Sequence, residues 1–310
     1  MIGFHQVSVV IPCYNEQEII GETIRRIKAL SEEIEIIVVC DGCTDRSAQE
    51  AEKEGALVVE HTYNLGNGAT VKTGGFFASR DYIIFIDADL QHQPEDIPRL
   101  MEFFPSYDLI IGARTNKCNT SAFRGLGNKI LICLAQFISN SKIDDLTSGF
   151  RAMKKSFFNQ FAHLFPQRYS YPTTSTLAGL CSGKFVKFVP IDSVVERNTG
   201  RSNIRPFKDG LRFVEMIIRI IALYRPQKIF LPLSLVLFII GVIAGILQLM
   251  NTGGIRSVSV IMMLAGVILF MNGLVVTQLS QVLLSMNENR EPRKVIEDKT
   301  LYQNESEVLN

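Results

Sequence analysis

Residues 82–91 read YIIFIDADLQ, an apolar run that ends in two carboxylates one residue apart. Such a run is typical of a buried strand, which would deliver both acids to one edge of a sheet. Because side chains alternate along a strand, Asp87 and Asp89 point to one side and Ala88 to the other. Two hard oxygen donors at that position suit Mg²⁺ or Mn²⁺, which in turn would hold a diphosphate. A D-x-D pattern alone also fits a solvated strand end, so the prediction depends on the rest of the chain.

Apolar runs and helical patterns alternate through the first third of the chain. The predicted strands cover residues 7–11, 34–40, 56–59, 82–87 and 108–112. The predicted helices cover residues 16–30, 45–54 and 66–79, and another begins after Pro94. This alternation predicts an α/β fold with a doubly wound, mostly parallel sheet. Ligands of such sheets bind beyond the carboxyl ends of the strands, where Asn15, Asp41, Asp87 and Asp89 all fall.

The composition limits the class of protein. The chain has 310 residues and a formal net charge of +1, which excludes a broad basic surface for nucleic acid. Its first six residues run directly into a strand, so no signal peptide is expected. Among six cysteines, Cys40 and Cys43 have the C-x-x-C spacing of a redox motif. Their neighbours fit another motif, and reduced cytosolic thiols are the preferred interpretation.

Two uncharged segments, residues 229–250 and 257–285, are each long enough to cross a bilayer as a helix. Only six residues separate them, which predicts a hairpin. Gly241 and Gly245 offer a close-packing face, and the helices would also allow copies of the chain to associate. Residues 197–228 contain eight Lys or Arg against two acids, and three basic residues follow the second segment. Both outer ends are therefore expected on the cytoplasmic side.

These patterns divide the chain into four parts. We expect a cytosolic catalytic domain over residues 1–205, an amphipathic interfacial helix over 206–227, two transmembrane helices over 228–285 and a polar cytosolic tail over 286–310. The interfacial helix is predicted because charged residues recur along one face of an otherwise apolar pattern. They are Lys208, Arg212, Glu215 and Arg219. A surface helix packed on the sheet is the alternative.

Six motifs, in order along the chain, resemble those of family 2 glycosyltransferases. The first four are VVIPCYNE at residues 9–16, DGCTD at 41–45, NLGNG at 64–68 and DADLQ at 87–91. The last two are DLTSGFR at 145–151 and R-x-x-G-R-S at 197–202. These two resemble the polyprenyl-phosphate branch, which includes dolichyl-phosphate mannose synthases and undecaprenyl-phosphate glucosyltransferases. The resemblance covers about residues 7–205 and implies a GT-A-type catalytic domain.

The resemblance implies roles for individual residues. Asp87 and Asp89 would hold the metal, and together with Gln91 they would form the catalytic set. The nucleotide-binding residues would be Pro12, which is expected to end its strand, and Tyr14, Asn15, Glu16, Asp41 and Lys72. Lys72 also fits a solvated helix lysine. His92 is expected to be exposed and to have no catalytic role.

The implied acceptor is a polyprenyl phosphate, dolichyl or undecaprenyl. A phosphate monoester carries close to two negative charges at neutral pH, so it is already a nucleophile. It needs positioning and charge neutralisation, which arginine forks supply, rather than a general base. The candidate acceptor-phosphate residues are Arg114, Arg124, Arg151, Arg197, Arg201 and Ser202. Each arginine taken alone also fits a surface charge.

The expected function is inverting, metal-dependent transfer of a hexose from a UDP- or GDP-linked sugar to a polyprenyl phosphate at the cytosolic membrane face. One alternative is a hydroxyl acceptor, in a glycolipid or polysaccharide, with Asp144 or Asp145 as the base. Another is a nucleotide-sugar-binding membrane protein without catalysis, although both D-x-D acids are present. Cys40 and Cys43 stand where the family often has an aspartate and a serine, and many relatives carry a glutamate near the position of Thr174. The sugar and the nucleotide therefore stay open.

Overall fold

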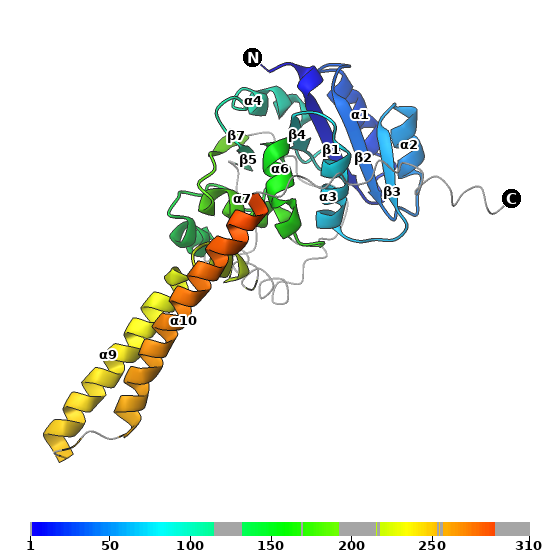
Figure 1. The fold of residues 1–310 in the computed structure, drawn as a ribbon. Coiled ribbons are helices and arrows are strands. Elements are labelled where there is room, and N and C mark those ends of the chain that lie inside the picture. The colour runs from blue at the N-terminus through cyan, green and yellow to red at the C-terminus, as the bar shows by residue number, and fades with distance from the viewer. Residues whose placement is uncertain are drawn as a thin grey trace.

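The computed structural model describes residues 2–114, 132–168, 170–191, 215, 218–252, 254 and 257–288. Within these residues, a seven-stranded sheet carries helices on both faces, and two long helices extend away from it as a hairpin (Figure 1). The predicted α/β architecture with a mostly parallel sheet is confirmed.

The strands are β1 (Val7–Cys13), β2 (Glu35–Asp41), β3 (Leu57–His61), β4 (Tyr82–Phe85), β5 (Leu109–Arg114), β6 (Arg151–Lys154) and β7 (Val186–Ile191). Their order in the sheet is β3-β2-β1-β4-β6-β5-β7, and β6 runs antiparallel to both of its neighbours. The first five match the predicted strands to within two residues at each end. The sequence did not predict β6 or β7. β6 is only four residues with a charged residue at each end, and β7 is an edge strand containing Lys187 and Pro190.

Helices cover both faces of the sheet. One face carries α1 (Ile20–Lys28), α2 (Ser47–Lys53) and α4 (Ile97–Met101), and the other carries α3 (Asn67–Phe77), α6 (Lys155–Phe161) and α7 (Tyr171–Cys181). Three short 3₁₀ turns are η1 (Phe4–Gln6), η2 (Pro94–Asp96) and η3 (Ala162–Leu164). In α1, Ile20, Ile24 and Ile27 recur at helical spacing and are fully buried. Burial of each such side chain contributes roughly 1.5–3 kcal/mol, so two apolar layers hold the strands in place.

The antiparallel direction of β6 decides which residues lie beside the end of β4. The carboxyl ends of the parallel strands β1, β2, β4 and β5 share an edge, and the antiparallel β6 begins at that same edge. Its first residue, Arg151, pairs with Phe85, the last residue of β4. Residues 144–150, which lead into β6, therefore lie beside the residues that follow β4.

Pro12 does not end its strand, which corrects the prediction. β1 continues to Cys13, and Pro12 pairs with Val39 of β2. In the described sheet β4 pairs with β1 only as far as Val10, so Pro12 lies where β1 has no strand on its other side. A proline, which lacks an N–H donor, is tolerated at such a position.

The hairpin consists of α9 (Gln227–Thr252) and α10 (Ser257–Glu288). Both helices are long and apolar enough to cross a membrane, and only 17% and 11% of their most apolar windows are buried inside the protein. A core helix would be covered by protein, so lipid is the environment that suits these surfaces. The helices approach closely at Gly241 and Gly266, where an added Cβ would lie 2.9 Å and 3.0 Å from backbone nitrogens of the partner helix.

The segment before the hairpin is described only in part. Residues 218–224 are helical, and Ile220 and Ile221 are buried against residues 135 and 138. Of the remaining predicted interfacial helix, Glu215 is helical, Arg225 and Pro226 interrupt the helix, and Gln227 already belongs to α9. Residues 206–214, 216 and 217 lie outside the described residues. Of the predicted polar tail, residues 286–288 belong to α10 and the others lie outside. The interfacial role and the domain boundaries therefore stay predictions.

Candidate active site

Asp87 and Asp89 lie just beyond β4, at the edge where β6 begins. Ala88 between them is buried at 3% exposure, whereas both aspartates are half-buried, as side-chain alternation requires. The Ala88 carbonyl accepts a hydrogen bond of 3.1 Å from Thr23 Oγ1 of α1. The backbone under the two carboxylates is therefore anchored to the helix layer.

The turn after Asp89 has an unusual backbone. Leu90 has a φ of 55°, and the backbone N–H of Gln91 donates to Asp89 Oδ1 at 3.2 Å. In the described part of the chain, Leu90 and Asn15 are two of three non-glycine residues with positive φ, and both follow strands that end at this edge. Non-glycine residues seldom adopt this conformation, and such strain clusters at functional sites.

Gly149 brings residues 144–151 against Asp87. A Cβ added to Gly149 would lie 2.6 Å from Asp87 Oδ2, closer than such contacts allow. The carbonyl of Gly149 accepts a hydrogen bond of 2.9 Å from the hydroxyl of Tyr171, whose ring packs edge-on against Phe85. A side chain at position 149 would therefore displace the Asp87 carboxylate.

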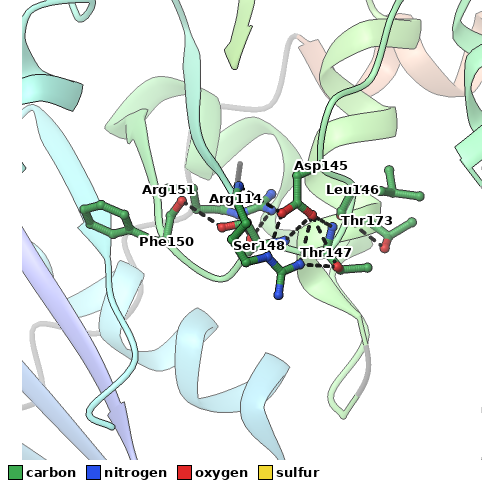
Figure 2. A network of polar contacts seen from close by, with 8 residues as sticks. All are labelled: Arg114, Asp145, Leu146, Thr147, Ser148, Phe150, Arg151 and Thr173. Carbon is green, nitrogen blue, oxygen red and sulfur yellow. Dashed lines mark hydrogen bonds and ion pairs between the residues drawn. The ribbon is translucent and has the colours of Figure 1, made fainter. Parts of the chain in front are cut away.

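Asp145 forms an ion pair with Arg114 (Figure 2). The guanidinium donates through Nε to Oδ2 at 2.7 Å and through Nη2 to Oδ1 at 3.0 Å. Backbone N–H groups of Thr147 and Ser148 also donate to Oδ1. Burial alone would raise the pKa of Asp145, but the donors from Arg114 and Thr147 hold this pKa below its ordinary value. Arg114, which was expected to meet an acceptor phosphate, thus has a carboxylate partner, and Asp145 is a weak base.

Arg151 is fully buried beneath the same loop (Figure 2). Its guanidinium donates to the carbonyl of Ser148, to the carbonyl of Pro172 at 2.9 Å and to Ser175 Oγ at 2.6 Å. Burial lowers the pKa of Arg151 to about 10, so the side chain is still a cation at neutral pH. The sequence indicated an arginine that contacts the acceptor phosphate. The structure instead gives this guanidinium internal partners, because α7 supplies oxygen acceptors that the local motif did not reveal.

The predicted nucleotide residues Tyr14, Asn15 and Glu16 form the turn after β1. Asn15 Oδ1 accepts from the backbone N–H of Thr44 at 2.8 Å, and the N–H of Glu16 donates to Ser47 Oγ at 2.8 Å. The Tyr14 side chain is 50% exposed. The turns that follow β1 and β2 are therefore joined by hydrogen bonds and present Tyr14 outward.

Asp41, also predicted to bind the nucleotide, organises the chain around it. It is 4% exposed, and its carboxylate accepts from the backbone N–H groups of Leu65 and Gly66 at 2.9 Å and 2.8 Å. His61 Nδ1 lies 2.8 Å from Asp41 Oδ1, and His61 Nε2 lies 2.9 Å from Thr73 Oγ1. The sequence reasoning missed His61, which no motif marks.

A second missed feature is the contact between the start of α3 and residues 166–168. The N–H of Gly68 donates to Arg168 O at 3.3 Å, and the N–H of Ala69 donates to Gln167 O at 2.7 Å. A Cβ on Gly68 would clash with the carbonyl of Pro166. Gly68 therefore allows a close approach to the protein's own backbone. No local signal could reveal a contact across a hundred residues.

The structure places Lys72 and His92 differently. Lys72 is half-buried on α3, and burial lowers its pKa. His92 is 4% exposed and stacks on Phe150, so the expectation of an exposed histidine was wrong. Burial and the charge of Arg114 lower the pKa of His92 to about 4, so the ring is neutral at pH 7. Arg124, Arg197, Arg201 and Ser202 lie outside the described residues.

Comparison with known families identifies the chain. A model described as glycosyl transferase family 2 matches residues 8–161, and the GtrB C-terminal hairpin matches residues 225–282. An uncharacterized protein of Methanocaldococcus jannaschii is 30% identical over 203 residues, which cover 62% of this chain and 83% of that protein. The chain belongs to glycosyl transferase family 2. It is therefore a glycosyltransferase, as the sequence predicted, and its two C-terminal helices match the GtrB hairpin.

Two named relatives of this glycosyltransferase are undecaprenyl-phosphate 4-deoxy-4-formamido-L-arabinose transferases. The protein from Pseudomonas fluorescens is 37% identical over 163 residues, which cover 49% of this chain and 48% of that protein. The protein from an Enterobacter species is 34% identical over 172 residues, which cover 52% of each chain. The matched part therefore spans about half the length of these relatives.

A solved structure of similar fold is glucosyl-3-phosphoglycerate synthase from Mycobacterium tuberculosis in complex with Mg²⁺ and UDP. It has a TM-score of 0.57 at 19% identity and covers 69% of this chain and 79% of that chain. A second structure of that protein, with Mn²⁺, UDP-glucose and phosphoglyceric acid, has a TM-score of 0.55 at 20% identity, over 69% and 79% of the two chains. At this identity the likeness shows the fold, and it confirms the expected GT-A type.

Proposed function

We propose that this glycosyltransferase moves a hexose from a nucleotide sugar to a polyprenyl phosphate at the cytosolic face of a membrane. The named relatives are undecaprenyl-phosphate transferases, which supports the acceptor class. The apolar hairpin α9–α10 would hold the enzyme where such a lipid resides. The names of these relatives specify 4-deoxy-4-formamido-L-arabinose rather than a hexose. The identity of the transferred sugar is therefore the first part of the proposal to test.

The ion pair of Asp145 with Arg114 is the observation that favours a phosphate over a hydroxyl acceptor. A hydroxyl acceptor needs a base to remove its proton. Asp145 is paired with Arg114 and its pKa is lowered, so it accepts a proton poorly. The other candidate, Asp144, is 46% exposed and lies 3.2 Å from Lys142 Nζ. A phosphate monoester is already deprotonated at neutral pH and needs neither residue as a base.

Asp87 and Asp89 fit a divalent cation. They supply two carboxylates at the end of a strand, and Mg²⁺ commonly completes its shell with water and substrate phosphates. Mg²⁺ or Mn²⁺ accompanies UDP in the M. tuberculosis structures of the same fold. The cation would neutralise charge on the diphosphate leaving group. Gly149 would keep the Asp87 carboxylate in place, and the Gln91 N–H would orient that of Asp89.

The donor nucleotide would lie along the turns after β1 and β2. Tyr14, Asn15 and Glu16 would contact it directly, while Asp41 would shape the neighbouring loop rather than offer a free carboxylate. Lys72, with its lowered pKa, is a candidate phosphate contact. A single displacement inverts the anomeric centre, so an α-linked donor would give a β-linked lipid-phosphate sugar.

The proposed topology places residues 1–205 and 286–310 in the cytosol, with the interfacial helix 206–227 beside the membrane and the transmembrane helices within 228–285. Positive charge at both outer ends of the hairpin supports this orientation. Arg124, Arg197, Arg201 and Ser202 would hold the acceptor phosphate near that surface. Association of copies through α9 and α10 is a further proposal.

The test is a transfer assay with the purified full-length protein. The donors are UDP-glucose, GDP-mannose and a UDP-linked 4-deoxy-4-formamido-L-arabinose, each with undecaprenyl phosphate, dolichyl phosphate or free polyprenol. Mass spectrometry should find a glycolipid with a hexose donor and a phosphate acceptor, and none with the free alcohol. Efficient transfer to the alcohol would reject the acceptor class. Transfer of the amino-pentose alone would reject the hexose.

A further inference from the structure

Three cysteine side chains meet below the turns proposed to hold the donor. The Sγ atoms of Cys13, Cys40 and Cys43 all lie within 4.8 Å of one another. Cys13 and Cys40 are register partners on the neighbouring strands β1 and β2. Gly42, with a φ of 65°, turns the chain after β2 so that Cys43 comes back to the other two. The proposed transfer reaction uses none of these sulfurs.

The three thiols have unequal environments. Cys13 and Cys40 are buried in the apolar core at 2% and 0% exposure, whereas Cys43 is only half-buried. Hydrogen bonds from the thiols of Cys13 and Cys40, and from the Asn15 backbone and the Ser47 hydroxyl, lower the pKa of Cys43. Hydrogen bonds to its neighbouring thiols, followed by burial, raise the pKa of Cys40. The Cys43 thiol also donates to the carbonyl of Cys13 at 3.6 Å. The cluster thus combines one partly exposed thiol of lowered pKa with two buried thiols, the arrangement of a reactive cysteine beside resolving partners.

We propose that Cys43 is an oxidation-sensitive thiol that forms a reversible disulfide with one of the two buried cysteines. The oxidant is a hydroperoxide. The Cys43 thiolate attacks the terminal oxygen, the O–O bond breaks, and the leaving oxygen takes a proton, which gives a sulfenic acid. The thiol of Cys13 or Cys40 then loses its proton and attacks Cys43 Sγ. The S–O bond breaks, water leaves and the S–S bond forms. A dithiol reductant reverses the reaction by exchange.

A soft metal ion could use the same sulfurs, but the environment favours oxidation. Three thiolate ligands would require deprotonation of Cys13 and Cys40 inside the apolar core. Burial disfavours that charge. Within the described residues, the cluster has no fourth His, Cys, Asp or Glu ligand. Metal binding is therefore the competing outcome of the test.

The disulfide would act on the donor site, an effect that rests on the proposed function. Thr44, next to Cys43, donates its N–H to Asn15 Oδ1, and Ser47 Oγ accepts from the N–H of Glu16. Movement of Cys43 Sγ toward a buried partner would pull on the turn that carries both predicted nucleotide residues. We expect oxidation to weaken binding of the donor's nucleoside diphosphate, UDP or GDP, several-fold and a dithiol to restore it.

The first experiment reads the thiols directly and does not depend on activity. Purified full-length protein is treated with hydrogen peroxide, alkylated with N-ethylmaleimide and analysed by peptide mass spectrometry. We expect a disulfide between Cys43 and Cys13 or Cys40, reversed by dithiothreitol, and none in Cys43→Ser. The matched control is Cys133→Ser, which removes an exposed cysteine outside the cluster and should leave the disulfide intact.

Two further measurements complete the test. In the untreated wild-type protein, Cys43 should react with iodoacetamide at pH 6 faster than Cys133. Because this measurement uses no variant, a folding defect cannot produce the result. Binding of UDP and of GDP is measured by calorimetry before and after peroxide. A cluster that stays reduced, or a stoichiometric zinc ion that protects it, would overturn the proposal. A disulfide that leaves binding of the preferred nucleotide unchanged would overturn the coupling to the donor site. Failure of the transfer assay alone would leave the disulfide result standing.

Discussion

Two loops at the carboxyl edge of the sheet use their charged residues in different ways. After β4, Ala88 is buried and Asp87 and Asp89 are half-buried at the surface of the turn. In residues 144–151, Asp145 is paired with Arg114 and Arg151 is fully buried. The charged side chains of the first loop are partly exposed, whereas those of the second loop form the hydrogen bonds and the ion pair that hold that loop together. A charged residue in a motif can therefore be scaffolding as readily as it can be a ligand.

Because Arg151 is fully buried in the second loop, we expect its replacement to cause the largest loss of stability. Replacement of Arg151 by Met removes the donor from the carbonyls of Ser148 and Pro172 and from a buried hydroxyl. Several buried acceptors left without a donor should together cost about 3–5 kcal/mol. Thermal unfolding of the full-length protein measures this loss. The control Arg99→Met, at an exposed position on α4, should change stability by less than about 0.5 kcal/mol. Unchanged unfolding with a raised acceptor KM would make Arg151 a direct ligand.

A smaller effect is expected from His92 in acid. Its pKa is about 4 in the folded protein and about 6.5 in an unfolded chain. Between these values the unfolded chain binds more protons, so stability should fall as the pH falls from 6.5 to 4, by about 3 kcal/mol in all. Denaturant unfolding at pH 7 and pH 5 tests this. His92→Leu should flatten the loss, whereas His5→Gln at an exposed position should not. Equal pH slopes in wild type and His92→Leu would contradict the prediction.

Gly149 tests the contact between the two loops. Gly149→Ala places a methyl group 2.6 Å from Asp87 Oδ2, so the carboxylate must move while the fold can stay intact. We expect turnover to fall about tenfold, equivalent to about 1.4 kcal/mol, with a nearly unchanged melting temperature. The control is Gly21→Ala in α1, where the nearest atom would be 3.7 Å from the new Cβ. Full activity in Gly149→Ala would show that the loops do not constrain each other.

The smallest effect is expected at Asp144, which separates the two acceptor classes. This residue is 46% exposed and its partner Lys142 is 85% exposed, so the pair is worth little. Asp144→Asn should lower turnover by less than about twofold, because a phosphate acceptor needs no base at this position. Transfer kinetics with the phosphate acceptor measure this. Loss of activity, together with transfer to a free alcohol, would favour the hydroxyl-acceptor alternative.

The sequence predicted those parts of the fold that depend on local pattern. Long β-branched runs marked β1 to β5, and their alternation with helices placed Asp41, Asp87 and Asp89 at one edge. β6 was not predicted, because a strand of four residues has too little local pattern and is defined by its pairing with β4 and β5. Its antiparallel direction is a tertiary property, yet it decides what lies beside Asp87.

The burial of individual site residues was harder to predict. Arg151 was predicted to contact the acceptor phosphate because three of its hydrogen-bond partners lie more than twenty residues later, on α7. His92 looked exposed because its cover, Phe150, comes from the opposite loop. The burial of both residues has one cause, since a motif names residue types but does not reveal which segments pack over them.

One paired measurement separates Asp89, which we propose as a metal ligand, from Asp145, which is paired with Arg114 in the neighbouring loop. Turnover and melting temperature are measured for Asp89→Asn and Asp145→Asn in saturating Mg²⁺ or Mn²⁺. Asp89→Asn should lose at least about a hundredfold in turnover with an unchanged melting temperature. Asp145→Asn should melt at a lower temperature, because Arg114 loses its partner. Normal turnover in Asp89→Asn, with inactive but fully stable Asp145→Asn, would contradict these two roles.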